Sequence, residues 1–252
     1  MRALMVMLCL AAAPLLAQSP VSGVWPVKPV AFVDLAYPPD ALEARVIGTV
    51  VVRVGTDPSG RVVSADVISG SSRLAPAVVA NVRQWVWSPG ARSEVIVYRF
   101  EIDGASCNDD LRSLFRLPHP NLAVVTTCTS PRRAGLPPPP EDLVLASWGS
   151  PIYPDLAFSA RITGIVVLEV SVDSNGKVVD SRPLTELPLV TAAAVAHSRT
   201  WRFRPSDRRR GIIVYEFAQD KRSCGTDSPM EFWQVGANFW RLSACSPFIG
   251  GG

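Results

Sequence analysis

The chain has 252 residues, of which 48% are hydrophobic and 19% are charged, and its formal net charge is +3. Its arginines are scattered except at Arg132–Arg133 and Arg208–Arg210, so the composition predicts no basic surface and argues against nucleic-acid binding. The length is enough for two domains of about 100 residues, each able to bury a modest hydrophobic core.

Residues 1–17 are interpreted as a secretory signal peptide. Arg2 precedes an apolar run from Ala3 to Leu16, and Ala17 provides the small residue that cleavage requires. A run of about 14 apolar residues is shorter than the roughly 20 that span a bilayer, although an uncleaved membrane anchor remains the alternative. The segment therefore predicts export from the cytoplasm.

The chain contains an internal duplication. The stretch Tyr37–Pro89 reappears without a gap as Tyr153–Pro205, at an offset of 116 residues. The agreeing positions are Tyr37/Tyr153, Pro38/Pro154, Ala41/Ala157, Arg45/Arg161, Gly48/Gly164, Asp57/Asp173, Gly60/Gly176, Trp85/Trp201 and Pro89/Pro205. Because chance does not preserve turn glycines, an aspartate and a tryptophan at one offset, each copy is expected to form the same fold.

Each copy is expected to begin with a short helix. The prolines of the Tyr-Pro pairs, Pro38 and Pro154, suit the first turn of a helix. Gly48 and Gly164 are expected to end these helices, because glycine accepts the left-handed conformation that follows a helix.

A hairpin is expected next in each copy. Alternating apolar residues predict strands after Gly48 and Gly164, each with one buried face. Asp57–Gly60 and Asp173–Gly176 have the residues of tight turns, so each chain segment should return as a second antiparallel strand.

A second helix and a third strand complete the predicted order. Four residues form a helical stripe in each copy: Leu74, Val78, Val82 and Trp85 in the first, and Val190, Ala194, His197 and Trp201 in the second. Alternating residues at 96–102 and 213–217 then predict a last strand, now at an offset of 117. The expected order is helix, strand, strand, helix, strand.

Four cysteines follow the last strands in a repeated pattern. Cys107 and Cys128 are 21 residues apart, as are Cys224 and Cys245. In an exported protein, a duplicated unit that closes on itself favours the pairs Cys107–Cys128 and Cys224–Cys245, although four cysteines allow three pairings. A loop of this size would stabilise the fold by roughly 3 kcal/mol. A zinc site is the less favoured alternative because no short Cys-x-x-Cys spacing occurs.

A proline-rich linker divides the repeats. The four consecutive prolines from Pro137 to Pro140 favour an extended, semi-rigid spacer. We therefore expect a signal peptide at 1–17, a first repeat with its extension at 18–131, a linker at 132–149 and a second repeat at 150–252. Residues 18–35 are expected to lack regular structure.

The repeated motif resembles the C-terminal domain of TonB, the periplasmic energy transducer of Gram-negative bacteria. The resemblance is carried, twice, by Tyr-Pro, a glycine before an apolar strand, Asp-x-x-Gly, and Trp-x-aromatic-x-Pro before a last strand. It implies an α+β fold in which each copy is a three-stranded antiparallel sheet with helices on one face. It also implies a periplasmic location and a protein partner.

In that family the last strand offers a free edge to which an extended segment of an outer-membrane receptor adds as a further strand. By position, these edges would be Glu94–Glu101 and Gly211–Phe217. The outward side chains predicted to contact the partner are Val95, Val97, Arg99, Glu101, Ile212, Val214 and Glu216. The sequence has neither the membrane anchor nor the long proline-rich spacer that the resemblance implies for a full transducer.

The sequence favours a binding module over an enzyme. His119 and His197 have structural explanations, and no nucleophile, metal-ligand pair or phosphate loop accompanies them. No enzyme activity, cofactor or metal is therefore expected, and the partner is expected to be protein. The alternatives are a self-associating structural protein of the envelope and an uncleaved, membrane-anchored TonB-like transducer. A less favoured alternative is glycan binding by an exposed pair that Trp233 and Trp240 could form.

Overall fold

The computed structural model describes residues 27–102, 113–127, 143–219, 230–236 and 238–244. Three of the sequence predictions fall on other residues: the signal peptide at 1–17, the four cysteines and the prolines from Pro137 to Pro140. These predictions lie outside the described residues.

Each repeat follows the predicted order of elements and adds two strands at its end, and the second repeat also has two short strands, β6 and β9. The first contains α1 (Pro39–Glu43), β1 (Gly48–Thr56), β2 (Val62–Ser69), α2 (Ala75–Val82), β3 (Arg92–Ile102), β4 (Ser113–His119) and β5 (Leu122–Thr127). The second contains β6 (Leu145–Ser147), α3 (Asp155–Ser159), β7 (Gly164–Val172), β8 (Val178–Pro183), α4 (Thr191–Ser198), β9 (Arg202–Phe203), β10 (Arg210–Gln219), β11 (Met230–Gly236) and β12 (Phe239–Ala244).

Each sheet has five strands, so the predicted three-stranded sheet is wrong. The strand orders are β2-β1-β3-β5-β4 and β11-β12-β10-β7-β8. The predicted strands form an antiparallel group, but β5 adds in parallel to β3, and β12 adds in parallel to β10. The strands β4 and β5, and β11 and β12, therefore complete the two five-stranded sheets.

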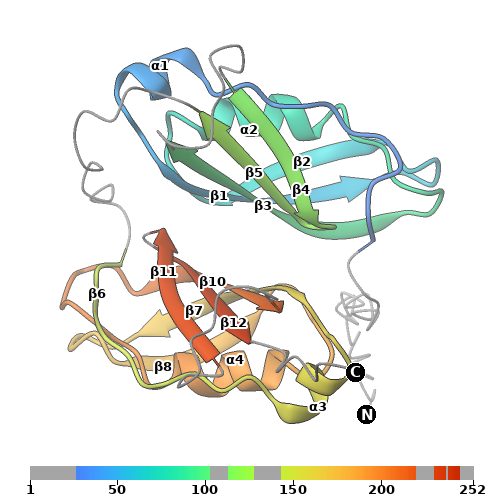
Figure 1. Cartoon of the computed structure of the whole chain (residues 1–252). Helices are drawn as coiled ribbons and strands as arrows, with labels where there is room; N and C mark the ends of the chain where they lie inside the picture. The colour runs from blue at the N-terminus through green and yellow to red at the C-terminus, as the bar shows by residue number, and fades with distance from the viewer. Residues whose placement is uncertain (1–26, 103–112, 128–142, 220–229, 237, 245–252) are drawn as a thin grey trace, which may run out of the picture.

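The helices lie on the outer faces and the two sheets face each other between them (Figure 1). In the first repeat the predicted stripe is confirmed, since Leu74, Val78, Val82 and Trp85 are all buried against β1 and β3. The second repeat buries the equivalent stripe in the same way. Each repeat thus has its own core under its helices.

The first helices end earlier than predicted. The left-handed residue is Arg45 (φ 52°) in the first repeat and Arg161 (φ 55°) in the second, not the glycines. The N–H of Val46 donates to the carbonyl of Ala41 at 2.8 Å, which closes the helix end with a six-residue loop. Gly48 and Gly164 instead begin the strands β1 and β7.

The turn glycines are required by the close approach of another segment. A Cβ added to Gly176 (φ 77°) would lie 1.9 Å from the carbonyl oxygen of Phe203, and Gly60 approaches Trp87 in the same way. The Gly176 carbonyl accepts the N–H of Phe203 at 2.8 Å, so the turn also anchors the segment after α4.

We expect Gly176→Ala to lower the free energy of unfolding by about 1–3 kcal/mol, because it adds both backbone strain and a clash. Urea unfolding followed by tryptophan fluorescence would measure the loss. Gly90→Ala is a control for the clash alone, since Gly90 also has a positive φ (131°) but its nearest neighbour is the end of the flexible Arg92 side chain at 3.1 Å. Equal losses for both variants would contradict this explanation.

The segments before each Tyr-Pro pair are more ordered than predicted. In the first repeat, Val30 and Ala31 both donate N–H groups to the carbonyl of Val86. In the second, β6 pairs with β9, and Leu143 is buried in the core. The predicted linker at 132–149 therefore includes residues that belong to the second domain.

Candidate protein-interaction surfaces

The predicted edges at Glu94–Glu101 and Gly211–Phe217 are not edges. β3 lies between β1 and β5, and β10 lies between β7 and β12. The N–H of Val97 donates to the carbonyl of Asn121 at 2.9 Å, and that of Val214 donates to Asn238 at 2.8 Å. The chain's own extension therefore occupies the position that a receptor segment takes in the TonB resemblance.

The side chains predicted to contact a partner lie between the two sheets. Val95, Val97, Ile212 and Val214 are buried together in one apolar cluster that both repeats contribute. Leu122 and Phe239, which begin β5 and β12, belong to the same cluster. These residues therefore hold the repeats together in this structure and are not exposed to a partner.

Charged residues cross this interface in a buried network. Arg99 lies 3.2 Å from Glu216 and 2.6 Å from Glu101, and its guanidinium stands over the ring of Phe239 at 4.8 Å. The other oxygen of Glu216 lies 3.6 Å from Arg241 and 3.4 Å from His119. Glu216 is only 3% exposed, so its charge depends on these partners.

The environment keeps Glu216 ionised. Burial raises the pKa of its carboxyl, but the hydrogen bond with His119 and the charges of Arg241 and Arg99 outweigh burial and leave the pKa below its ordinary value. Arg99 and Glu216 occupy equivalent positions in the repeats, at the offset of 117. Opposite charges at two equivalent positions are the sequence feature that could have indicated a contact between the repeats.

His119 and His197, the only histidines, both have partners in the folded chain. Nε2 of His119 lies near Glu216, as described above. The ring of His197 is buried, with Nε2 at 2.7 Å from the carbonyl of Gly149 and Nδ1 at 3.0 Å from the hydroxyl of Tyr215. Among the described residues, no three His, Cys, Asp or Glu side chains lie together in a group that could hold a metal ion.

Four tryptophans are buried in the cores of the two repeats. Trp85, Trp87, Trp201 and Trp240 are each at most 1% exposed. The side chain of Trp233 lies outside the described part of the structure. Trp148 is 47% exposed and its ring packs against Trp240 at 4.7 Å, so it covers the aromatic core of the second repeat.

Among the described strands, the edges of the sheets are β2, β4, β8 and β11. Residues that hinder strand addition occur in two of them: Pro118 in β4, and Arg182 with Pro183 in β8. The eight residues of β2 contain neither proline nor a basic residue, and Val63 and Val67 on it are 68% and 44% exposed. Of β2, β4 and β8, the strand β2 is the one most open to pairing, and β11 (Met230–Gly236) also contains neither proline nor a basic residue.

The backbone of Val67 faces away from the sheet. Since the Val97 N–H points to β5, the polar groups of its neighbour Ile96 face β1, and Ile96 is opposite Val52. Val52 therefore directs its own N–H and C=O toward β3 and away from β2. Val67 is opposite Val52, so its N–H and C=O point to the open side of the edge. At the equivalent position, opposite Leu168, β8 has Pro183.

A shallow apolar groove runs beside this edge. Its lining comes from β2 and α2 and comprises Val67, Ser72, Ala75, Pro76, Val79, Ala80 and Arg83. Because side chains alternate along a strand, a segment added to β2 would direct every second side chain into this groove.

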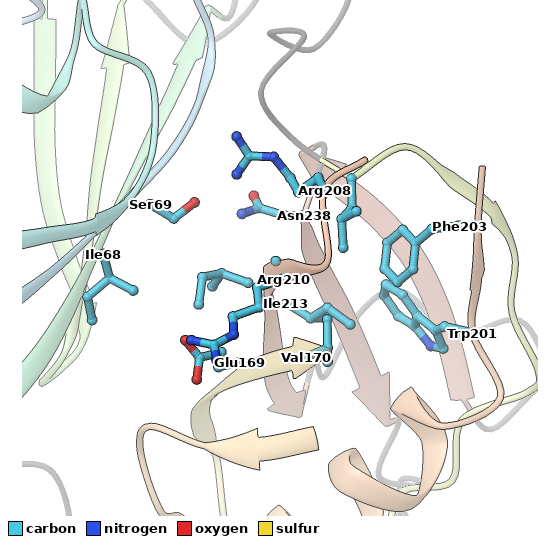
Figure 2. A pocket seen from close by; sticks show the side chains of 13 residues that line it. Ile68, Ser69, Glu169, Val170, Trp201, Phe203, Arg208, Arg210, Ile213 and Asn238 are labelled. Atoms are coloured by element: carbon cyan, nitrogen blue, oxygen red, sulfur yellow. The ribbon is translucent and has the colours of Figure 1, made fainter. Parts of the chain in front are cut away.

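A deeper cleft lies where the two repeats meet. Figure 2 shows Ile68 and Ser69 on one side, Trp201 and Phe203 on the other, and Arg208, Arg210 and Asn238 between them. The cavity has a volume of about 130 Å³. Apolar residues of the second repeat, including Leu143, Ile212 and Ile213, form most of the remaining wall.

The family comparison agrees with this repeated architecture. The family model described as Gram-negative bacterial TonB protein C-terminal matches residues 33–103 and 149–216, together more than half of the chain. The chain belongs to this family. The two matched segments are the two tandem copies of the TonB C-terminal domain, as the duplication predicts. Each match ends before the strands β4 and β5, or β11 and β12, so these strands lie outside the matched segments.

Membership places the chain among Gram-negative envelope domains with a TonB-like role in protein interaction. Searches among curated proteins and among solved structures gave no significant match. Within the described residues, no helix has the length and hydropathy needed to span a bilayer.

Proposed function

We propose that this TonB-family chain is a periplasmic protein-binding module that receives an extended partner segment at the free edge of β2. The observation that carries the proposal is the outward-facing backbone of Val67 on a strand without proline or basic residues. An added strand gains affinity from main-chain hydrogen bonds, and the groove between β2 and α2 selects its side chains.

The family supports an outer-membrane receptor as the source of this segment, which would link the chain to TonB-dependent transport. The proposed binding mode differs from the one expected for the family in the strand to which the receptor segment adds. β5 and β12 pair with β3 and β10 inside the chain, so a receptor segment would need to displace a resident strand there. Addition to β2 requires no displacement.

The decisive variant is Val67→Pro, which removes the outward N–H and leaves the hydrogen bonds between β1 and β2 in place. We expect it to weaken binding of receptor-derived peptides at least about tenfold, the effect of losing roughly 1.4 kcal/mol. The measurement is fluorescence anisotropy with labelled ten-residue peptides that tile the periplasmic segments of outer-membrane receptors.

Two companion variants separate the backbone from the side chain. Val67→Thr keeps the N–H and a similar shape, so it should retain binding, while Pro183→Val should open β8 and provide a second, weaker site. Hydrogen exchange should show new protection of the Ala65 and Val67 amides when peptide is bound. Undiminished binding by Val67→Pro would rule out addition at β2.

Self-association is the second candidate, because two copies could pair through β2 itself. Exposed Val63 and Val67 on an unguarded edge favour such pairing. In that case light scattering should show a dimer that Val67→Pro converts to a monomer, with no response to receptor peptides.

A further inference from the structure

The two repeats meet through equivalent surfaces. The ion pair in the interface joins Arg99 to Glu216, which are equivalent positions at the offset of 117. A contact between equivalent residues lies on an approximate twofold axis when their neighbours also meet as equivalent pairs. The apolar cluster around the ion pair meets this condition, since it contains both members of the pairs Val51/Val167, Val95/Ile212, Val97/Val214 and Leu122/Phe239.

A surface of this kind can pair in more than one way when a chain carries it twice. A first repeat can meet a second repeat, as in this structure, but the same apolar faces would also fit two first repeats or two second repeats of different chains. Pairing of like repeats would link chain to chain through both surfaces and leave an open assembly. The residues in which the two repeats differ must therefore determine which pairing forms.

The charges on the axis are opposite in sign. Nη1 of Arg99 lies 3.2 Å from Oε2 of Glu216, and the side chains are only 10% and 4% exposed. Two first repeats would bring two guanidinium groups together at this point, and two second repeats would bring two carboxylates together. Like charges placed against each other in an interface suppress the wrong pairing.

Each charge also has a neighbour in its own repeat, but at a different atom. Glu101 lies 2.6 Å from Nε of Arg99, and Arg241 lies 3.6 Å from Oε1 of Glu216. The contact across the axis uses Nη1 and Oε2 instead. These neighbours therefore leave the atoms on the axis directed at the other repeat.

Two further contacts favour the pairing of unlike repeats. Nε2 of His119, from the first repeat, lies 3.4 Å from Oε1 of Glu216, whereas the equivalent of His119 is Gly236, which has no side chain. Two second repeats would lose this contact. The guanidinium on the axis stands 4.8 Å from the ring centre of Phe239, whose equivalent is Leu122, so two first repeats would lose a cation–π contact.

We propose that Arg99 and Glu216 select the partner at this surface: a first repeat binds a second repeat, of its own chain or of a second copy, and repeats of the same kind reject each other. The partner that fits the first repeat is a domain with the same apolar face and an acidic residue on the axis. This selection closes the two surfaces on each other and prevents open assemblies. It is independent of strand addition at β2.

The test mixes two variants of the full chain. Arg99→Glu leaves an acidic residue at both positions and Glu216→Arg leaves a basic residue at both, so no two surfaces within either sample are complementary. Each variant alone should have a larger radius of gyration than the wild-type chain in small-angle X-ray scattering. In an equimolar mixture every pairing between the two variants joins opposite charges, so light scattering should show about twice the mass of either variant alone.

The controls separate partner selection from folding and from general charge effects. Tryptophan fluorescence should show that each repeat of the single variants stays folded, because Trp85 and Trp201 lie in separate cores. The double variant Arg99→Glu/Glu216→Arg is complementary within one chain and should return to the wild-type radius. Mixing Glu169→Arg with Arg182→Glu, a pair within one repeat, should not raise the mass.

Pairing through β2 would raise the mass of every sample equally, so the comparison of the mixture with its components excludes it. Single variants as compact as the wild type would overturn the proposal, and so would a mixture that keeps the mass of its components. A double variant that stays expanded would also contradict it, because selection by charge requires that reversal of both charges is tolerated.

Discussion

Replacing Glu216 by leucine is expected to lower the free energy of unfolding by about 3–5 kcal/mol, the usual cost of leaving buried charges without their partner. Arg99 and Arg241 would then face each other across the interface with His119 nearby. Urea unfolding followed by tryptophan fluorescence measures the loss. Small-angle X-ray scattering should show a larger radius of gyration as the repeats separate.

A double-variant cycle isolates the pair between the repeats. Arg99→Met combined with Glu216→Leu should cost at least about 1 kcal/mol less than the sum of the single variants, because an apolar pair fits the surrounding cluster of Val97 and Val214. The control is Glu169→Gln, which breaks the exposed pair with Arg182 and should cost no more than about 1 kcal/mol. A loss below that value for Glu216→Leu would show that the network does not hold the repeats together.

The same carboxylate gives the interface a pH dependence. The pKa of Glu216 is lowered in the folded chain from its ordinary 4.5, so the folded state favours the ionised form. Its contribution to stability is therefore present above about pH 4.5 and is lost as the pH falls through the lower pKa of the folded state.

Replacing His197 by alanine is expected to cost about 2–4 kcal/mol, because the buried Tyr215 hydroxyl and Gly149 carbonyl lose their partner. The Gly149 carbonyl can only accept, so Nε2 carries the proton and Nδ1 accepts from the Tyr215 hydroxyl. Trp201 Nε1 also points to Nδ1, at 3.4 Å.

In the first repeat, an amide side chain makes the hydrogen bonds that His197 makes in the second. Asn81, equivalent to His197, donates through Nδ2 to the carbonyl of Val33 at 2.9 Å. Its Oδ1 accepts from Tyr98 at 2.8 Å and from Trp85 at 3.0 Å. We therefore expect His197→Asn to retain most of the stability that His197→Ala loses.

The two residues differ in their response to pH. Burial lowers the pKa of His197 from 6.5, although the hydrogen bond to Gly149 partly opposes this effect. The ring is faced by Tyr215 from β10, Trp201 after α4 and Phe232 from β11, none of them charged near neutral pH. Its stabilising effect is thus present above about pH 6.5 and is lost as the pH falls through the lower pKa of the folded state.

Thermal unfolding from pH 8 to pH 5 is the measurement. The wild-type chain should lose stability below pH 6.5, and His197→Asn should lose clearly less over the same range. Parallel curves for the two proteins would show that another group causes the acid sensitivity.

Local features of the sequence predicted the repeated unit well. Turn glycines and aspartates, the stripe from Leu74 to Trp85, and alternating valines each depend on neighbours within a few residues, so periodicity and turn chemistry identify them. The TonB family followed from the order of these features. The helix ends at Arg45 and Arg161 were missed, because arginine in the left-handed conformation has no reliable sequence signal.

The interaction surface depended on tertiary structure. The sequence predicted that the faces of β3 and β10 with Val97 and Val214 are exposed. Alternation shows that a strand has a second face, but it does not show what covers that face. Only the folded chain shows that each repeat covers the other, and that β5 and β12 close the edges that the resemblance predicted to be open. The sequence by itself therefore determined two TonB-like domains, while long-range strand pairing and the contact between the repeats decided which surfaces remain available to a partner.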